Sequence, residues 1–523
     1  MKKSLVLSAA TLIAAFSLLA GCAIAPNAEA APETTSAVSA INESAADFAA
    51  KASAAAVSAE VDASVSDRDA SGEYDAAAAV TLTPEDDLTI TKAGVYILSG
   101  SYENKMLVIE AGEDDKVQLV LDNAALENDS GPAIYVRSAD KVFLTAAAGT
   151  ENTISDGADY SVTDGDTELD AAVFSKDDLT VNGAGKLTIN GNYKHAVVSK
   201  DDLVVTAKDL TVNAANVGLS GKDSVRFSEA AVSITAGSDG VRADNDEDAD
   251  RGYVSVTDST LTVTSGKDGI QAETVFTAAG SAITVTSGGG HSGHILDSSE
   301  SYKGVKAGVS VSFDGGTVQI DALDDAIHTG GTILIRAGSF TLLSGDDGVH
   351  ADEKVEISGG TVGVTAHEGI EGTYILISGG EIDIQASDDG INAARKSDIL
   401  TPTVEITGGK VTFAVGPGDT DGIDSNGDII ITGGVVSVSG SSAFDYDGTA
   451  TFTGGEVYVN GQQVTALPNQ MMGGGMGGFG GGPGGQGGQG GGPGGQGGGP
   501  GGQGGGPGGQ GGQGGFGGKG GRP

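Results

Sequence analysis

The sequence predicts an all-β protein, a single-stranded parallel β-helix of about twelve turns. Three observations favour this fold. A short motif recurs with a period of 21 to 24 residues, the residue after its small central position is apolar in every repeat, and Gly-Gly pairs separate short alternating strands. Tryptophan is absent and aromatic residues make up 5% of the 523 residues, so a core must be built from Val, Ile, Leu and Thr, which favour strands.

The repeat is defined by an anchor, which is the small residue in the pattern polar, small, aliphatic, polar, small. The anchors are spaced by 21 to 24 residues, apart from three intervals of 29, 35 and 32 residues that contain insertions. Because the residue after each anchor is apolar, stacked turns would form one continuous buried column. The anchors are Ala172, Ala196, Gly218, Gly240, Gly269, Gly304, Ala326, Gly348, Gly369, Gly390, Gly422 and Ala443.

Gly-Gly pairs mark a second register, out of phase with the anchors, as in Ile357 to Val362 and Ile377 to Ile382. Each pair predicts a turn between two short strands, so one period holds about three strands. That is too little for a globular layer but suits one turn of a β-helix, whose neighbouring turns bury each other's aliphatic side chains. An antiparallel sandwich or barrel is the structural alternative, but hairpins would not need one fixed apolar position in every repeat.

A lipoprotein signal peptide is predicted over residues 1–21. Lys2 and Lys3 precede an apolar run from Leu5 to Ala20, which is too short for a stable membrane span. The run ends in the lipobox Leu-Ala-Gly-Cys, which predicts that Cys22 carries the lipid; an ordinary signal peptide with a chance cysteine is the alternative. The mature protein is therefore expected outside the cytoplasm, anchored to the bacterial cell membrane and exposed at the cell surface.

Two segments flank the predicted β-helix of residues 81–467. Residues 22–80 are rich in Ala, Ser, Asp and Glu with no sustained apolar period, which predicts a spacer with partial helix as an option. Residues 468–523 form a tail of Gly, Pro and Gln with almost no charge, which predicts disorder.

The composition excludes several functions. With 71 acidic and 28 basic residues the formal charge is −43, so nucleic acid and anionic membrane surfaces are poor partners. A single cysteine excludes an intramolecular disulfide and a Cys-based metal cluster. No phosphate loop, dinucleotide fingerprint or nucleophile elbow occurs in the sequence. We expect a monomer that does not bind nucleic acid.

Acidic residues gather in columns of the predicted stack, where equivalent positions lie about 4.8 Å apart. Seven of the twelve residues that precede the anchors are carboxylates, and more acids lie one position earlier and two positions after the anchors. Such a ladder is self-repulsive, so we expect a counterion, and Ca²⁺ is the hard cation that oxygen ligands prefer. A solvated acidic face is the alternative. The predicted metal ligands are Asp239, Asp268, Asp324, Asp325, Asp346, Asp347, Glu368, Glu371, Asp388, Asp389, Asp421 and Asp424.

The insertion from Asp244 to Gly252 resembles the start of a calcium-binding EF-hand loop, but it lacks the central glycine and the final glutamate of such a loop. It is interpreted as an acidic surface loop, with ion binding as the alternative. His328, His350 and His367 fall on the acidic columns, where pairing with carboxylates is favoured over hydrogen bonding to a sugar hydroxyl.

Several stretches of the chain resemble a bacterial carbohydrate-binding family, that of clostridial surface lipoproteins with a polysaccharide-lyase-like right-handed parallel β-helix. The similarity runs from about Thr83 to Asn460. It implies a binding module for polysaccharide, either cellulose-type or an acidic glycan such as pectin, that holds calcium. The stretches are Leu88 to Gly100, Asp129 to Val136, Val198 to Leu203, Asp244 to Asp250, Ser301 to Ala307 and the Asp-Asp-Gly turns.

The preferred function is a calcium-dependent cell-surface polysaccharide-binding protein for acidic, pectin-like or plant cell-wall glycans. The absence of tryptophan weakens an assignment to crystalline cellulose, where flat aromatic platforms give the contact area. The predicted carbohydrate contacts are Tyr302, Lys303, Lys306, His328 and His350, with Tyr193, Tyr253 and Tyr374 as further aromatic candidates.

Two other functions stay open. The first is a calcium-assisted polysaccharide lyase, in which Lys303 would remove the proton beside a uronate carboxylate. Lys303 is the only basic residue of the pre-anchor column between Asp239 and Asp421. The favoured interpretation is that it neutralises its acidic neighbours, which would raise its pKa and spoil it as a base. The second is a structural protein of the cell envelope.

Overall fold

The computed structural model describes residues 61–85, 88–165, 167–294, 297–418 and 420–469. The predicted signal peptide, Cys22 and the tail from residue 470 onward lie outside these ranges. Within them, 41 strands belong to one hydrogen-bonded sheet, and the one helix is α2 (Asp67–Ser71). Every strand pair is parallel except the last, β40 (Glu456–Val459) with β41 (Gln462–Val464). The prediction of an all-β chain of parallel strands is confirmed.

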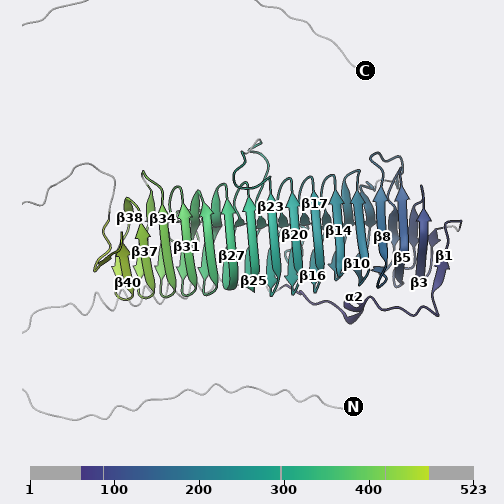
Figure 1. Cartoon of the computed structure of the whole chain (residues 1–523), viewed down its shortest axis with the longest axis horizontal. Coiled ribbons are helices and arrows are strands. Elements are labelled where there is room, and N and C mark those ends of the chain that lie inside the picture. Colours follow the sequence, from purple (N-terminus) through teal and green to yellow (C-terminus); the bar gives the residue numbers. More distant parts are fainter. Residues whose placement is uncertain (1–60, 86–87, 166, 295–296, 419, 470–523) are drawn as a thin grey trace, which may run out of the picture. The chain divides into compact units, whose positions relative to one another are not determined.

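The strands fall into three columns, and within a column each strand pairs with the equivalent strand one period later in the sequence (Figure 1). The first column carries the anchors. It consists of β2 (Thr89–Ile90), β4 (Leu107–Glu110), β6 (Ile134–Ser138), β9 (Ala171–Ser175), β12 (His195–Ser199), β15 (Leu219–Gly221), β18 (Val241–Ala243), β21 (Ile270–Ala272), β24 (Val305–Ala307), β26 (Ile327–Thr329), β28 (Asp347–Ile357), β30 (Glu368–Ile377), β32 (Ile391–Ala393), β35 (Asp421–Ser425) and β38 (Ser442–Tyr446).

The second column follows the first in each period, and the long strands β28 and β30 continue into it. Its own strands are β1 (Val80–Leu82), β3 (Gly94–Tyr102), β5 (Lys116–Asn128), β7 (Lys141–Ala146), β10 (Asp178–Gly183), β13 (Asp202–Val205), β16 (Ser224–Ser228), β19 (Tyr253–Thr257), β22 (Val275–Ala279), β25 (Ser310–Ala322), β27 (Thr332–Ser344), β33 (Thr403–Ile406), β36 (Asp428–Ile431) and β39 (Ala450–Phe452).

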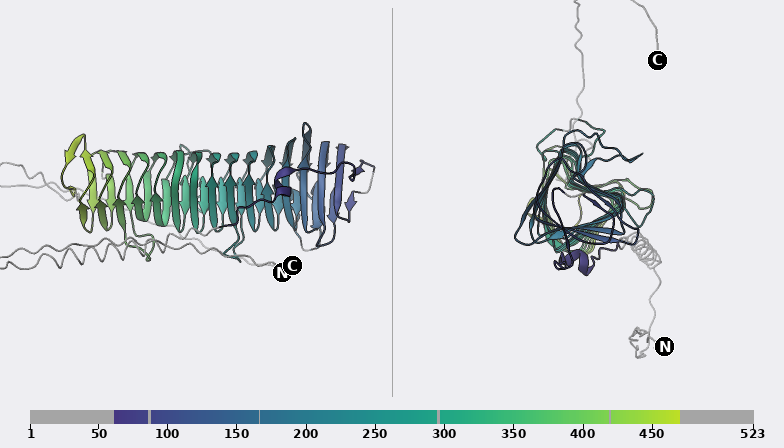
Figure 2. Two further views of the ribbon diagram at one scale, coloured as in Figure 1. Left: turned by 90° about the horizontal axis from the view of Figure 1, so that it is seen from below. Right: turned by 90° about the vertical axis from the view of Figure 1, so that its right-hand side faces the viewer.

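The third column completes each period, and β5, β25 and β27 extend into it. Its own strands are β8 (Glu151–Asp156), β11 (Lys186–Gly191), β14 (Asp209–Ala214), β17 (Ala231–Ala236), β20 (Thr260–Ser265), β23 (Ala282–Ser287), β29 (Thr361–Ala366), β31 (Glu381–Ala386), β34 (Lys410–Val415), β37 (Val435–Ser439) and β40. Seen end-on, strands of successive periods overlie one another around a common interior (Figure 2).

The apolar residues after the anchors form the predicted buried column. They pair with one another in register from period to period, as Ile370 does with Ile391 and Ile391 with Ile423. All twelve side chains are fully buried, which confirms the apolar column. They are Val173, Val197, Leu219, Val241, Ile270, Val305, Ile327, Val349, Ile370, Ile391, Ile423 and Phe444.

The anchors are small because adjacent periods approach closely at these positions. A Cβ atom added to Gly369 would lie 2.3 Å from the carbonyl oxygen of Gly390, and one added to Gly390 would lie 2.6 Å from the carbonyl oxygen of Gly422. The Gly-Gly turns have a different cause. Gly360 has a φ of 90° between β28 and β29, a backbone conformation that side chains of other residues strongly disfavour.

Residues 61–79, part of the predicted spacer, lie against the second column, with contacts from Gln118 in β5 to Tyr253 in β19. Helix α2 begins with a capping box between Ser66 and Asp69. The carboxylate of Asp69 is buried, lies 2.9 Å from the ammonium of Lys141 and accepts a hydrogen bond from Thr180. Burial alone would raise the pKa of Asp69, but Lys141 and the hydroxyl donors together lower it. No helix of the described residues is long and apolar enough to cross a bilayer.

Candidate functional site

Acidic side chains line the outer face of the first column. In β26, Ile327 and Thr329 are buried and His328 between them is half-buried, as the alternation of a strand requires. We call the residues two positions after the anchors the outer column. The parallel register stacks Arg242, Gln271, Lys306, His328, His350, Glu371, Asn392, Asp424 and Asp445 in that order.

The acids that precede the anchors have a structural role that the sequence did not indicate. In Asp268, Asp325 and Asp389, one carboxylate oxygen accepts the backbone N–H of the equivalent residue in the next period. The Lys303 nitrogen donates to Asp268 at 2.7 Å, and the Asp421 nitrogen donates to Asp389 at 2.7 Å. These acids therefore link successive periods through one oxygen, while Oδ2 of Asp268 and of Asp325 faces a lysine.

At the start of the acidic face, Asp239 and Asp268 lie beside basic side chains. A guanidinium nitrogen of Arg242 is 3.6 Å from an Asp239 carboxylate oxygen, and the ammonium of Lys306 is 3.6 Å from Asp268. Burial, followed by the charge of Asp268, raises the pKa of Asp239. This part of the predicted metal-ligand set is therefore only partly neutralised.

Lys303 neutralises the next pair of acids. Its ammonium lies 2.9 Å from Oδ2 of Asp324 and 2.6 Å from Oδ2 of Asp325. Burial alone would raise the pKa of Asp325, but the hydrogen bond with His328 and the charge of Lys303 hold it well below its usual range. Burial acts to lower the pKa of Lys303, and the two carboxylates outweigh it and raise that pKa. A lysine held as an ammonium ion is unsuited to removing a proton.

His350 gathers several carboxylates around one nitrogen. Its Nδ1 lies 2.8 Å from Oδ2 of Asp347 and 3.3 Å from Oε2 of Glu371. Burial opposes protonation of this ring, but the hydrogen bond to Asp347 and the neighbouring acids raise the pKa of His350. Burial raises the pKa of Asp347. The ammonium of Lys396 lies 2.7 Å from Oε1 of Glu371, so the middle of the face carries its own cations.

Three further predicted ligands lie beside this middle part. Partial burial of the carboxyl of Asp346, together with the charges of Asp325 and Asp324, raises its pKa. Glu368 accepts a hydrogen bond from the Asn392 amide at 3.0 Å. Possible ligand atoms of His367, Glu368 and Asp388 lie within 4.8 Å of one another.

The last part of the outer column offers oxygen atoms alone. Oδ1 of Asn392 and Oδ1 of Asp445 are buried and have no hydrogen-bond partner among the described residues. Asp424 lies between them in register. Burial and then the charge of Asp445 raise the pKa of Asp424 to about 6, and burial, with neighbouring acids adding to it, raises that of Asp389 to about 7. Neither Asp389 nor Asp424 forms an ion pair within the described ranges.

The predicted aromatic contacts are placed differently from expectation. Tyr253 and Tyr374 are buried, and their hydroxyls donate to the carbonyl oxygen of Asp62 and to Glu405, so their interpretation as exposed carbohydrate contacts is wrong. Tyr193 is half-buried and stacks on Tyr160 with ring centroids 4.3 Å apart.

Four of the five predicted carbohydrate contacts share one face and already pair with acids. Tyr302 is half-buried and lies next to Lys303 in the chain. Lys303, Lys306, His328 and His350 lie within 4.0 Å of carboxylates of the same face. Pairing with carboxylates, the role favoured by the sequence for the histidines, is confirmed at these two rings.

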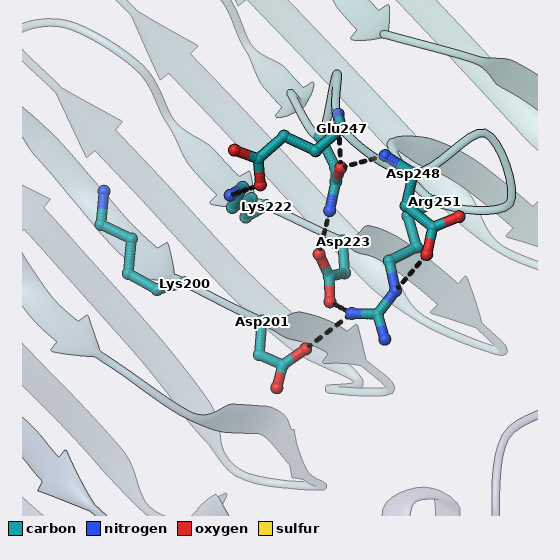
Figure 3. Close-up of a pocket in the computed structure, with 8 residues that line it drawn as sticks. Lys200, Asp201, Lys222, Asp223, Glu247, Asp248 and Arg251 are labelled. Carbon is teal, nitrogen blue, oxygen red and sulfur yellow. Dashed lines mark hydrogen bonds and ion pairs between the residues drawn. The ribbon is translucent and has the colours of Figure 1, made fainter.

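A separate polar cavity of about 380 Å³ lies beside the loop from Asp244 to Gly252 (Figure 3). The Arg251 guanidinium reaches the carboxylate of Asp223, and its Nε lies 3.4 Å from Asp248. The ammonium of Lys222 lies 3.1 Å from Glu247. Three acids of the loop, Asp244, Glu247 and Asp248, thus lie within 4.0 Å of basic side chains.

Comparisons with known proteins place much of the chain in one family. Residues 84–348 and 346–466 match the model of a family described as carbohydrate-binding domain-containing protein. A protein of Acetivibrio thermocellus with that same description is 34% identical over 131 residues, which are 25% of this chain; the match spans about half of that relative, 46% of its length. The structure of the polysaccharide lyase-like protein from C. thermocellum, a gadolinium derivative, matches with 28% identity and a TM-score of 0.40, over 45% of this chain and 96% of that one.

Proposed function

This chain belongs to the family of carbohydrate-binding domain-containing proteins, and on that premise we propose that it binds polysaccharide in a calcium-dependent way. The proposed scaffold is the right-handed single-stranded β-helix, supported by the period-to-period register of all three columns. The proposed location is the cell surface, where acyl chains on Cys22 would hold the protein on the membrane.

The observation that carries the calcium proposal is the pair of buried oxygens without partners, Oδ1 of Asn392 and Oδ1 of Asp445. Asp424 stands between them, and burial together with neighbouring acids raises its pKa and that of Asp389. An all-oxygen set of carboxylates and an amide carbonyl is the chemistry that Ca²⁺ prefers. These residues therefore fit the ion.

The middle of the face fits a calcium ion less well. The Lys303 ammonium contacts Oδ2 of Asp324 and Oδ2 of Asp325, and His350 Nδ1 contacts Oδ2 of Asp347. Calcium at those predicted ligands would have to displace a built-in cation. We therefore propose the end of the outer column as the calcium position.

An acidic glycan is the ligand class that this arrangement favours. A protein with a charge of −43 repels a uronic acid polymer at low ionic strength. Bound calcium supplies local positive charge that can join a uronate carboxylate to the carboxylates of the protein. The side chains of Asp424, Asp445 and Asn392 would hold the ion at the outer face.

Glycan-array binding with calcium and with EDTA tests the function. We expect uronic acid polymers to be bound in calcium and released in EDTA, with Asp424→Asn weakening binding and the exposed Asp383→Asn leaving it unchanged. A protein that binds no glycan under either condition would contradict the binding function. The same glycans bound equally with and without EDTA would contradict calcium dependence.

A further inference from the structure

The middle of the outer column differs from its end because it offers two imidazole rings. His328 and His350 are register partners on β26 and β28, with ring centroids 4.7 Å apart. Both Nδ1 atoms face one buried carboxylate oxygen. His328 Nδ1 lies 2.8 Å from Oδ2 of Asp325, and His350 Nδ1 lies 3.7 Å from the same atom. Two nitrogens and an oxygen thus converge on one point.

The spacing of these atoms suits a small divalent ion. Zinc binds imidazole nitrogen and carboxylate oxygen at roughly 2.0–2.2 Å, so ligand atoms around a tetrahedral zinc lie roughly 3.4 Å apart. The observed separations of 2.8 Å and 3.7 Å bracket that value. Carboxylate oxygens of Asp347 and Glu371 lie 2.8 Å and 3.3 Å from His350 Nδ1 and can supply the fourth ligand.

The acids around the rings outnumber the lysines. Four acids have side chains no more than 15% exposed, and two lysines pair with them. His350 Nε2 is buried and has no hydrogen-bond partner among the described residues, with Oδ1 of Asp352 3.5 Å away. The four acids are Asp324, Asp325, Asp347 and Glu371, and the two lysines are Lys303 and Lys396.

We propose that Asp325, His328 and His350 form a site for a borderline divalent transition-metal ion such as Zn²⁺, completed by a carboxylate of the next period. Imidazole ligands select zinc-like ions, whereas the oxygen-only end of the column suits calcium. When the ion binds, Lys303 keeps Asp324 as its partner at 2.9 Å and gives up Oδ2 of Asp325 to the metal. The face then carries two classes of metal site, separated along one column.

Zinc binding to the full chain, measured by competition with a chromophoric chelator in excess Ca²⁺, tests the site. We expect the wild type to bind zinc. His328→Gln and His350→Gln should each weaken zinc affinity at least tenfold, because even the loss of a residue that supports a metal ligand lowers metal affinity roughly 10- to 100-fold. His291→Gln is the matched control: His291 pairs with Asp321 at 2.8 Å, outside the cluster, and its loss should leave affinity unchanged.

Three results would overturn the proposal. The first is that the wild type binds no more zinc than the His328→Gln, His350→Gln double variant. The second is that all single variants bind zinc with equal affinity. The third is that calcium displaces zinc when the two ions are present at similar concentrations. Circular dichroism of each variant reports folding. Should His350→Gln fail to fold, His328→Gln decides alone, since its ring is the more exposed, at 22% against 14%.

Discussion

Replacing Asp389 by Asn should change stability in opposite directions with and without calcium. The amide keeps an oxygen that can accept the N–H of Asp421, whose nitrogen lies 2.7 Å from Oδ1 of Asp389. The substitution removes a carboxyl group whose pKa burial has raised to about 7. Each unit of pKa shift corresponds to about 1.4 kcal/mol. Solvent screening at this partly exposed side chain reduces the effect, so in EDTA at pH 7 we expect stabilisation of about 1 kcal/mol or less.

In calcium the order reverses. An ion that binds only the folded state stabilises it by RT ln(1 + [L]/Kd), about 2.7 kcal/mol at a hundredfold excess over Kd. If Asp389→Asn weakens calcium binding tenfold, the same concentration contributes about 1.4 kcal/mol. Urea unfolding followed by circular dichroism measures both conditions. The exposed Asp383→Asn is the control and should respond to calcium as the wild type does. Destabilisation of Asp389→Asn in EDTA, or an equal calcium response in all three proteins, would refute this reasoning.

Three other outcomes follow from the same structure. Ile391→Asp buries an unpaired charge between Ile370 and Ile423, so its urea midpoint should fall by far more than that of Asp389→Asn; equally mild effects would contradict the buried column. Burial raises the pKa values of Asp389 and Asp424, so the folded chain holds protons that the unfolded chain releases near pH 4. In EDTA the stability of the fold should therefore fall as the pH rises from about 4 to about 7. A thermal midpoint that rises over that interval would contradict these pKa shifts. Incubation with polygalacturonate should produce no ultraviolet absorbance from unsaturated ends; sustained growth abolished by Lys303→Ala would make the protein a lyase.

The buried column was predictable because a parallel stack repeats one local environment in every period. Ile370, Ile391 and Ile423 occupy equivalent positions, and register alone brings them together. The outer column follows from the same register, which is why the stacking of Asn392 and Asp424 could be read before the structure. Periodic order thus fixes which side chains are neighbours along the stack.

Contacts that do not repeat could not be read in this way. Tyr253 is covered by a segment whose Asp62 carbonyl accepts its hydroxyl, 191 residues away in sequence. Asp69 forms an ion pair with Lys141, although residues 22–80 show no apolar period that would predict packing against the sheet. Lys303 was expected to neutralise its acidic neighbours, but Lys396 contacts Glu371 from an insertion, and the sequence did not indicate that pair.

The affinity for polygalacturonate in millimolar calcium and in EDTA, at the same low ionic strength, tests the central proposal most directly. Calcium bridging predicts binding that is lost on chelation, weakened by Asp424→Asn and unchanged by Asp383→Asn, while a neutral glucan responds only through the stability of the fold. Tight binding of the uronate polymer in EDTA would contradict the calcium bridge.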